Sequence, residues 1–192
     1  NERKIVKNGK GEMQLGGVIY SDSADKASRF IMNCNQKGIP LLFIQDVNGF
    51  MVGSRAEHNG IIKDGAKMVN AMANSIVPKF TIIIGNSYGA GNYAMCGKAY
   101  DPNLILAWPT ARMAVMGGEQ AAKVLLNLEE SKLRKEGKTL NKTEKNNLLL
   151  SIKMKYNNQM SPYYAASRMW IDEIIDPKDT RKHISIGIEA AS

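Results

Sequence analysis

The sequence predicts an α/β fold in which a mostly parallel sheet is covered by helices. Between residues 16 and 110, short apolar runs alternate with segments whose apolar residues recur at helical spacing. Residues that favour turns or helix ends separate these segments. Parallel strands need crossover helices between them, so this alternation indicates a mostly parallel sheet with helices on its faces.

The first predicted elements are a strand, a helix and a second strand. Residues 16–20 (GGVIY) form a short apolar run that ends at Ser21–Asp22, a pair that favours a helix N-terminus. A helix is then predicted by apolar residues at helical spacing, namely Ala24, Ala27, Phe30, Ile31 and Cys34. The run LLFIQDV predicts the next strand, which ends at Asn48–Gly49.

The next helix has an apolar face along its whole length. The residues expected to face the core are Ile62, Ala66, Val69, Ala73 and Ile76. Pro78 ends this helix, and Phe80–Ile84 is predicted as a parallel strand buried on both faces. We interpret residues 85–97 (GNSYGAGNYAMCG) as a glycine-rich turn that opens a helix of small residues. Two further strands are predicted at Leu104–Trp108 and Met113–Met116.

From Gly118 onward the chain is predicted to be helical. Two apolar stripes predict an antiparallel helix hairpin, and they consist of Val124, Leu125 and Leu128, and of Leu148, Leu149, Ile152 and Tyr156. The polar, Lys-rich segment 133–147 is the expected tip of this hairpin. Two shorter helices are predicted in residues 161–170 and 180–191.

Composition and charge limit the classes of function. A chain of 192 residues corresponds to one domain, and its 44% hydrophobic and 23% charged residues exclude disordered and fibrous proteins. The net charge of +8 raises nucleic acids and anionic lipids as partners. Residues 119–158 hold nine Lys/Arg and five Glu, which is half of this charge, but no aromatic platform accompanies them. We therefore expect a solvated hairpin tip, with neither nucleic acid nor membrane as a partner.

Cysteine and histidine usage is sparse. The two cysteines, Cys34 and Cys96, cannot form a disulfide framework, which favours a reducing compartment. The two histidines, His58 and His183, have no metal ligand at i+4, so no metal site is expected. No apolar run approaches the roughly 18 residues that span a membrane.

One motif points to a serine hydrolase. Residues 85–89 (GNSYG) match G-x-S-x-G, the nucleophile elbow, with Ser87 as the nucleophile. The partners expected in the order of that class would be Asp172, Asp176 or Asp179 and then His183. The pattern is short and common in glycine-rich turns, and no HGGG-like oxyanion loop precedes it, so this function is a distant alternative. The spacing of the glycines fits neither a dinucleotide fingerprint nor a P-loop.

The glycine-rich turn itself has two interpretations. Gly89, Ala90 and Gly91 lie at a predicted helix N-terminus, where unpaired N–H groups favour an anion and two of them can form an oxyanion hole. Tight packing of a helix against the sheet explains the same glycines. The pair Gly117–Gly118 opens another predicted helix in a similar way. Residues 49–53 (GFMVG) follow the carboxyl end of a strand, where ligands bind in open parallel sheets.

Five long stretches together resemble one family, the carboxyltransferase subunit of biotin-dependent acyl-CoA carboxylases, a branch of the crotonase (ClpP-like) superfamily. They are QDVNGFMVG (45–53), GIIKDGAKMV (60–69), VPKFTIIIGNSYGAGNYAMCGKAYDP (77–102), WPTARMAVMGGEQAA (108–122) and SPYYAASRMWIDEIIDPKDTR (161–181). GAGNYAMCGKAYDP and VMGGEQAA look most like methylcrotonyl-CoA carboxylase β subunits. The resemblance implies a crotonase-like spiral of ββα units, with residues 16–192 as part of the second, C-terminal domain. Residues 1–15 form a lead segment outside the resemblance, and Asp64 stands where the family usually has a basic residue.

The resemblance also implies an activity, the transfer of CO2 from carboxybiotin to an acyl-CoA of the methylcrotonyl-CoA type. Propionyl-CoA or other acyl-CoA carboxylases, or decarboxylases, of the same family are the alternative. By resemblance, the backbone N–H groups around Ala90–Gly91 form the catalytic oxyanion hole for the biotin ureido oxygen. The residues that would line the binding pocket are Gly89, Tyr88, Phe50, Gly117 and Gly118.

The implied cofactor is biotin on a partner carrier domain, with acyl-CoA as substrate and no metal in this domain. The implied partners are a biotin carboxylase/biotin carrier subunit and a neighbouring copy in a homo-oligomer, whose N-terminal domain completes the site. The expected location is the bacterial cytoplasm or, in a eukaryote, the mitochondrial matrix. A catalytically silent oligomerisation module is the remaining distant alternative.

Overall fold

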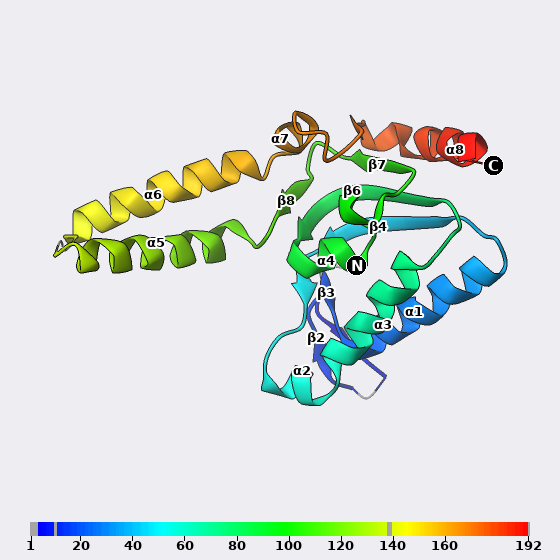
Figure 1. Cartoon of the computed structure of the whole chain (residues 1–192), viewed down its shortest axis with the longest axis horizontal. Helices are drawn as coiled ribbons and strands as arrows, with labels where there is room; N and C mark the ends of the chain where they lie inside the picture. The colour runs from blue at the N-terminus through cyan, green and yellow to red at the C-terminus, as the bar shows by residue number, and fades with distance from the viewer. Residues whose placement is uncertain (1–3, 10, 138–139, 192) are drawn as a thin grey trace.

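The computed structural model describes residues 4–9, 11–137 and 140–191, and Figure 1 shows how its elements are arranged. A five-stranded sheet forms the centre of the molecule. Its strands are β4 (Leu41–Val47), β6 (Lys79–Tyr88), β7 (Leu104–Ala107), β8 (Arg112–Ala114) and β9 (Glu173–Ile174). Every pairing in this sheet is parallel, which confirms the predicted α/β fold with a mostly parallel sheet.

The longest strand, β6, organises this sheet. One of its edges pairs with β4, with a register shift between Gln45 and Val47. The other edge pairs first with β7 and then, at residues 86–88, with β8. This second pairing carries β6 beyond the apolar run Phe80–Ile84, so residues 85–88 are strand where a turn was predicted. The turn is confined to Gly89, whose φ is +49°, and α4 (Gly89–Ala94) begins there.

Helices cover the two faces of the sheet unequally. On one side α1 (Ser21–Gln36) and α3 (Ile61–Ala73) lie side by side (Figure 1), and they share a core with β4. On the other side α8 (Thr180–Ala191) covers β6 and β7 through Ile184. Leu42 and Ile44 of β4 stay 43% and 49% exposed.

The core face predicted for α3 is wrong by one position. Ile62 and Ile76 are 71% and 89% exposed, and the helix ends before Ile76. The buried residues of α3 are Ile61, Gly65, Met68 and Met72. Both sets have helical spacing, so periodicity alone could not separate them. Gly65 suits the observed face because the ring of Phe50 packs on it, 2.9 Å from where a Cβ at Gly65 would lie.

Short elements complete the described chain. Within the lead segment 1–15, β1 (Val6–Lys7) and β2 (Met13–Gln14) form an antiparallel pair, while β3 (Val18–Ile19) pairs in parallel with β5 (Gly49–Phe50). The remaining elements are α2 (Ser54–His58), α7 (Pro162–Ala166) and the 3-10 turns Lys98–Tyr100 and Pro177–Asp179. Ser21 and Asp22, predicted as the N-cap of α1, lie in its first turn; the N-cap is Tyr20, whose N–H donates to Ser23.

The predicted helix hairpin is confirmed. Helices α5 (Gly118–Lys135) and α6 (Lys142–Gln159) run antiparallel and project from the sheet (Figure 1). Asn141 caps α6 by accepting from the backbone N–H of Glu144, and this fixes where the second helix starts. The apolar face predicted on α5 is wrong, since Val124, Leu125 and Leu128 are 46%, 41% and 62% exposed and the buried leucine of this helix is Leu126.

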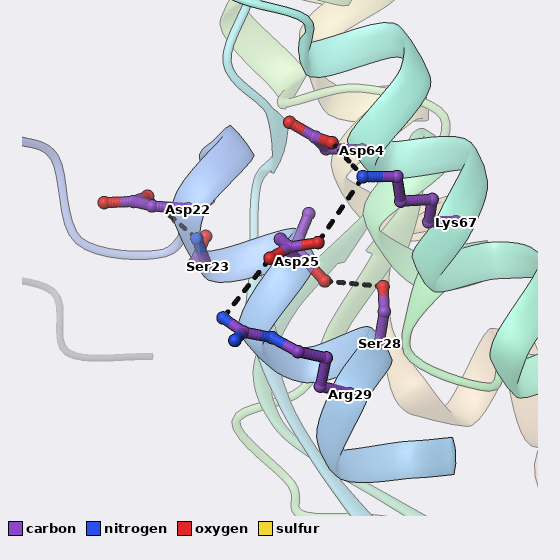
Figure 2. A network of polar contacts seen from close by, with 8 residues as sticks. Asp22, Ser23, Asp25, Ser28, Arg29, Asp64 and Lys67 are labelled. Atoms are coloured by element: carbon purple, nitrogen blue, oxygen red, sulfur yellow. Dashed lines mark hydrogen bonds and ion pairs between the residues drawn. The ribbon is translucent and has the colours of Figure 1, made fainter.

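The exposed sides of α1 and α3 are joined by charged residues (Figure 2). The Lys67 ammonium lies 2.9 Å from Asp64 and 3.5 Å from Asp25, and Arg29 lies 3.2 Å from the other oxygen of Asp25. Below them the buried Ser28 hydroxyl donates to the Ala24 carbonyl within α1. Asp64 therefore belongs to a surface ion-pair network.

Candidate functional site

A cavity of about 1120 Å³ lies where the chain leaves β5, β6 and β8. This is the edge at which parallel sheets bind ligands. Its wall combines residues after β5, on α3, at the start of α4, after β8 and on α6; examples are Met51, Ile61, Ala90, Val115 and Tyr156.

The start of α4 forms one part of this wall. Gly89 and Ala90 line the cavity, and the first N–H groups of a helix have no partner within it. The side chain of the N-cap residue, Tyr88, does not cap the helix. A Cβ at Gly89 would lie 2.7 Å from the carbonyl oxygen of Val115, so the turn depends on a glycine for space as well as for φ. Close approach of α4 to β8 therefore shapes this wall.

Gly91 has a different environment. A Cβ there would lie 2.6 Å from a methyl group of Val47 and 3.1 Å from the backbone of Gly49. Gly91 is buried and is not among the residues that line the cavity. Packing of the helix against β4 thus accounts for this glycine, and any contribution to binding comes from its backbone N–H.

The structure places the other predicted site residues at different depths. Phe50 lines the cavity, with its ring over Gly65. Tyr88 is buried, its hydroxyl donates to Asn86 at 3.2 Å, and it lies outside the lining.

The two glycines at the start of α5 also lie outside the lining. Gly117 is the N-cap of α5, and a Cβ there would meet the Gln120 side chain at 2.7 Å. Gly118 packs against α6, where a Cβ would lie 2.9 Å from the side-chain oxygen of Asn157. Gly118 therefore lets α5 and α6 approach closely at the base of the hairpin, whereas Gly117 packs against the first turn of its own helix.

Sequence reasoning missed a polar hydrogen-bond chain at the cavity wall, of which Ser87 and Asn92 line the cavity and Gln45 lies behind them. Asn92 donates to Ser87 at 2.7 Å, Ser87 donates to Gln45 at 2.5 Å, and Gln45 donates to the Met95 carbonyl at 2.7 Å. Gln45 and Ser87 are 0% and 2% exposed. A glutamine inside the apolar run LLFIQDV was the available signal, because buried polar side chains need partners.

The nucleophile-elbow hypothesis is wrong. Ser87 lies within β6, and its hydroxyl proton is committed to Gln45. His183 lies on α8 and contacts Glu173 at 3.2 Å. Asp172 accepts the N–H of Ile105, and Asp176 caps the turn at Pro177–Asp179. The residues of the proposed triad therefore hold separate structural roles.

The charges and thiols around the cavity are few. Of the described residues that line it, Glu57 and Lys98 are charged and none is histidine or cysteine. Cys96 is fully buried, and this burial raises the pKa of its thiol to about 11. Within the described ranges, no group of three or more His, Cys, Asp and Glu could hold a metal ion. Polar chemistry at this wall therefore falls to backbone N–H groups and to amide and hydroxyl side chains.

Several large apolar side chains stand exposed around the cavity. Val52, Ile62 and Val115 line it and are 77%, 71% and 76% exposed. Tyr93 and Trp170 also line it and are 52% and 43% exposed. Such a concentration is typical of a surface that another protein covers. Among the described helices, none is long and apolar enough to cross a membrane.

Comparison with known proteins identifies relatives of this chain. The sequence is 49% identical over 180 residues to the mitochondrial methylcrotonoyl-CoA carboxylase β chain of Dictyostelium discoideum, covering 94% of this chain and 31% of that protein. It is 48% identical to a biotin-dependent 3-methylcrotonyl-coenzyme A carboxylase β1 subunit of Mycobacterium tuberculosis, covering 93% of this chain and 34% of that protein. The chain thus spans about a third of the length of these relatives.

A solved structure supports the fold. The β subunit of P. aeruginosa geranyl-CoA carboxylase matches with a TM-score of 0.81 and 41% identity, over 93% of this chain and 34% of that one. The crotonase-like α/β class predicted from the sequence is confirmed by this likeness. The carboxyl transferase domain family matches residues 1–192. Because this match extends over the whole sequence, the chain belongs to the carboxyl transferase domain family.

Proposed function

We propose that this chain is part of the carboxyltransferase component of a biotin-dependent acyl-CoA carboxylase, and that its substrate is an acyl-CoA of the methylcrotonyl-CoA type. The observation that carries the proposal is the start of α4, where Gly89 and Ala90 bring helix N-terminal N–H groups to the wall of a large cavity. The absence of histidine and cysteine among the described lining residues fits a reaction that needs N–H donors more than a side-chain base. The names of the relatives support the same reaction class.

The chain's own part in the reaction is to stabilise negative charge on oxygen. When bound, carboxybiotin on a partner's carrier domain would supply CO2 and a ureido nitrogen that takes up a proton of the acyl-CoA, and the enolate left by that proton would form the new bond to CO2. The N–H groups of Ala90 and Gly91 would donate to the ureido oxygen as its charge develops. Removing one such donor typically costs about 10²–10³-fold in kcat. Phe50 and Ala90 would position the biotin ring beside the thioester.

The site needs a second wall. The exposed Val52, Ile62 and Val115 fit a neighbouring subunit that covers the open side of the cavity, and the N-terminal domain of a second copy is the proposed occupant. A biotin carboxylase/biotin carrier subunit is the other proposed partner. The D. discoideum relative is mitochondrial, which supports the mitochondrial matrix for a eukaryotic source, and the bacterial cytoplasm is proposed otherwise.

The proposal is tested with the complete subunit and its biotinylated partner, by measuring ATP-dependent carboxylation of methylcrotonyl-CoA, propionyl-CoA and geranyl-CoA. We expect the highest kcat/KM with methylcrotonyl-CoA. Equal or higher kcat/KM with another acyl-CoA would overturn the substrate assignment, and no carboxylation of any of them would overturn the function. Covalent labelling of Ser87 by a fluorophosphonate probe would instead restore the hydrolase hypothesis.

A further inference from the structure

The polar hydrogen-bond chain at the cavity wall, of which Ser87 and Asn92 line the cavity, joins both ends of α4 to the sheet. Asn92, in the first turn of α4, donates to Ser87 on β6 at 2.7 Å. Ser87 donates to Gln45 on β4, and Gln45 donates to the carbonyl of Met95, which is the C-cap of α4. The three bonds run in one direction, so Asn92, Ser87 and Gln45 each donate one hydrogen bond to the next group. This series of hydrogen bonds therefore starts at Asn92 of α4 and ends at Met95, the C-cap of the same helix.

A second buried hydroxyl supports the same helix end. Thr81 of β6 is fully buried, and its hydroxyl donates to the carbonyl of Cys96 at 2.6 Å. Main-chain carbonyls at two successive positions after α4 are thus bonded to side chains of the sheet. Breaking a bond in such a place leaves a buried polar atom unsatisfied, which is more costly than losing an exposed hydrogen bond.

Gly97 shows that the position of Asn92 is tightly defined. A Cβ at Gly97 would lie 1.9 Å from the side-chain oxygen of Asn92 and 2.6 Å from its Cγ. The φ and ψ of Gly97, −70° and −179°, are open to any residue, so backbone conformation does not require glycine here. The glycine is explained by the room that the Asn92 amide needs to reach Ser87.

We infer that Gln45, Ser87 and Asn92 act as positioning residues, which hold the first turn of α4 in place against the cavity. This rests on the proposed function, because the first turn carries Gly89 and Ala90. A helix of six residues is too short to be stable by itself, so without such anchors α4 would open locally at low cost. Donors that stabilise a transition state must be fixed before the reaction, and a displacement of about 1 Å can cost about 10²-fold in rate.

The test compares three serine variants in the complete subunit with its biotinylated partner. Ser87→Ala breaks the chain, Ser87→Thr keeps its hydroxyl, and Ser28→Ala removes another buried hydroxyl, which bonds within α1 (Figure 2). Hydrogen exchange is measured on peptides covering residues 85–97, and kcat and KM are measured with methylcrotonyl-CoA. Gly97→Ala, which displaces the Asn92 amide without removing a polar group, is the second perturbation should Ser87→Ala not fold.

We expect exchange in α4 to rise by about 10-fold in Ser87→Ala and in Gly97→Ala. We also expect kcat to fall by about 10- to 100-fold with little change in KM, and Ser87→Thr to recover most of both effects. Unchanged exchange in α4 relative to Ser28→Ala would overturn the inference, and so would faster exchange with an unchanged kcat. If the unmodified enzyme carboxylates no acyl-CoA, the proposed function fails. The hydrogen-exchange result is independent of this, because unchanged exchange in Ser87→Ala would still show that the hydrogen bonds of Ser87 do not restrain α4.

Discussion

The close approach of α4 to β8 predicts a large effect for Gly89→Ala. The substitution places an L-residue at φ +49°, which costs about 1–2 kcal/mol. It also places a Cβ 2.7 Å from the carbonyl oxygen of Val115, a backbone atom that cannot turn aside. Overpacking of this kind costs about 1–3 kcal/mol. The free energy of unfolding should therefore fall by about 2–5 kcal/mol.

Gly38→Ala is the matched control, because Gly38 has a φ of +64° and nothing within 4 Å of a Cβ. It should lose only the conformational part, about 1–2 kcal/mol. Urea unfolding followed by circular dichroism gives both values, and their difference isolates the contact with Val115. Equal losses, to within about 0.5 kcal/mol, would refute the argument that α4 is packed against β8 at this point.

Three further predictions concern the wall, the buried thiol and the surface network. Gly65→Ala should push the Phe50 ring, 2.9 Å from the new Cβ, into the cavity and raise KM for acyl-CoA in steady-state assays, whereas an unchanged KM would count against Phe50 as part of the binding wall. Burial raises the pKa of Cys96 from 9.0 to about 11, so its thiol should react with a thiol reagent at pH 8 only on unfolding. The free energy of unfolding should fall as pH rises from about 9 to about 11, because the thiol ionises first in the unfolded state. The hydrogen bond from Lys67 lowers the pKa of Asp64, so the interaction should stabilise the fold above the ordinary carboxyl range and lose this effect as pH falls through the lowered pKa. Asp64→Asn should remove this part of the pH dependence of the melting temperature.

Strong local patterns gave the fold class and most elements. The run LLFIQDV is β4 over the same seven residues, and the hairpin of α5 and α6 forms where two apolar stripes predict it, although the stripe on α5 stays exposed. Apolar runs and helical spacing reflect burial, and burial decides where such elements form. The face of α3 was predicted wrongly because both of its sides are apolar, so that tertiary contacts with Phe50 decide which side is buried.

The site depends on contacts between residues far apart in the sequence. Gly89 and Val115, and Gln45 and Met95, meet only after β6 pairs with both β4 and β8. The glycine-rich motif indicated a close backbone approach, but sequence alone did not assign packing to Gly91 and the cavity wall to Ala90. Similarly, nothing in the spacing of residues 85–97 showed that Gly97 makes room for Asn92.

The central claim is that N–H groups at the start of α4 stabilise an oxyanion, and a pair of variants at Ala90 tests it directly. Proline is tolerated in the first turn of a helix, so Ala90→Pro removes one N–H with little effect on the fold, while Ala90→Ser keeps it. Carboxylation of methylcrotonyl-CoA by the complete enzyme should fall by about 10²–10³-fold in kcat for Ala90→Pro and stay near the unmodified rate for Ala90→Ser. Equal kcat values for the two variants, at equal melting temperatures, would contradict the account.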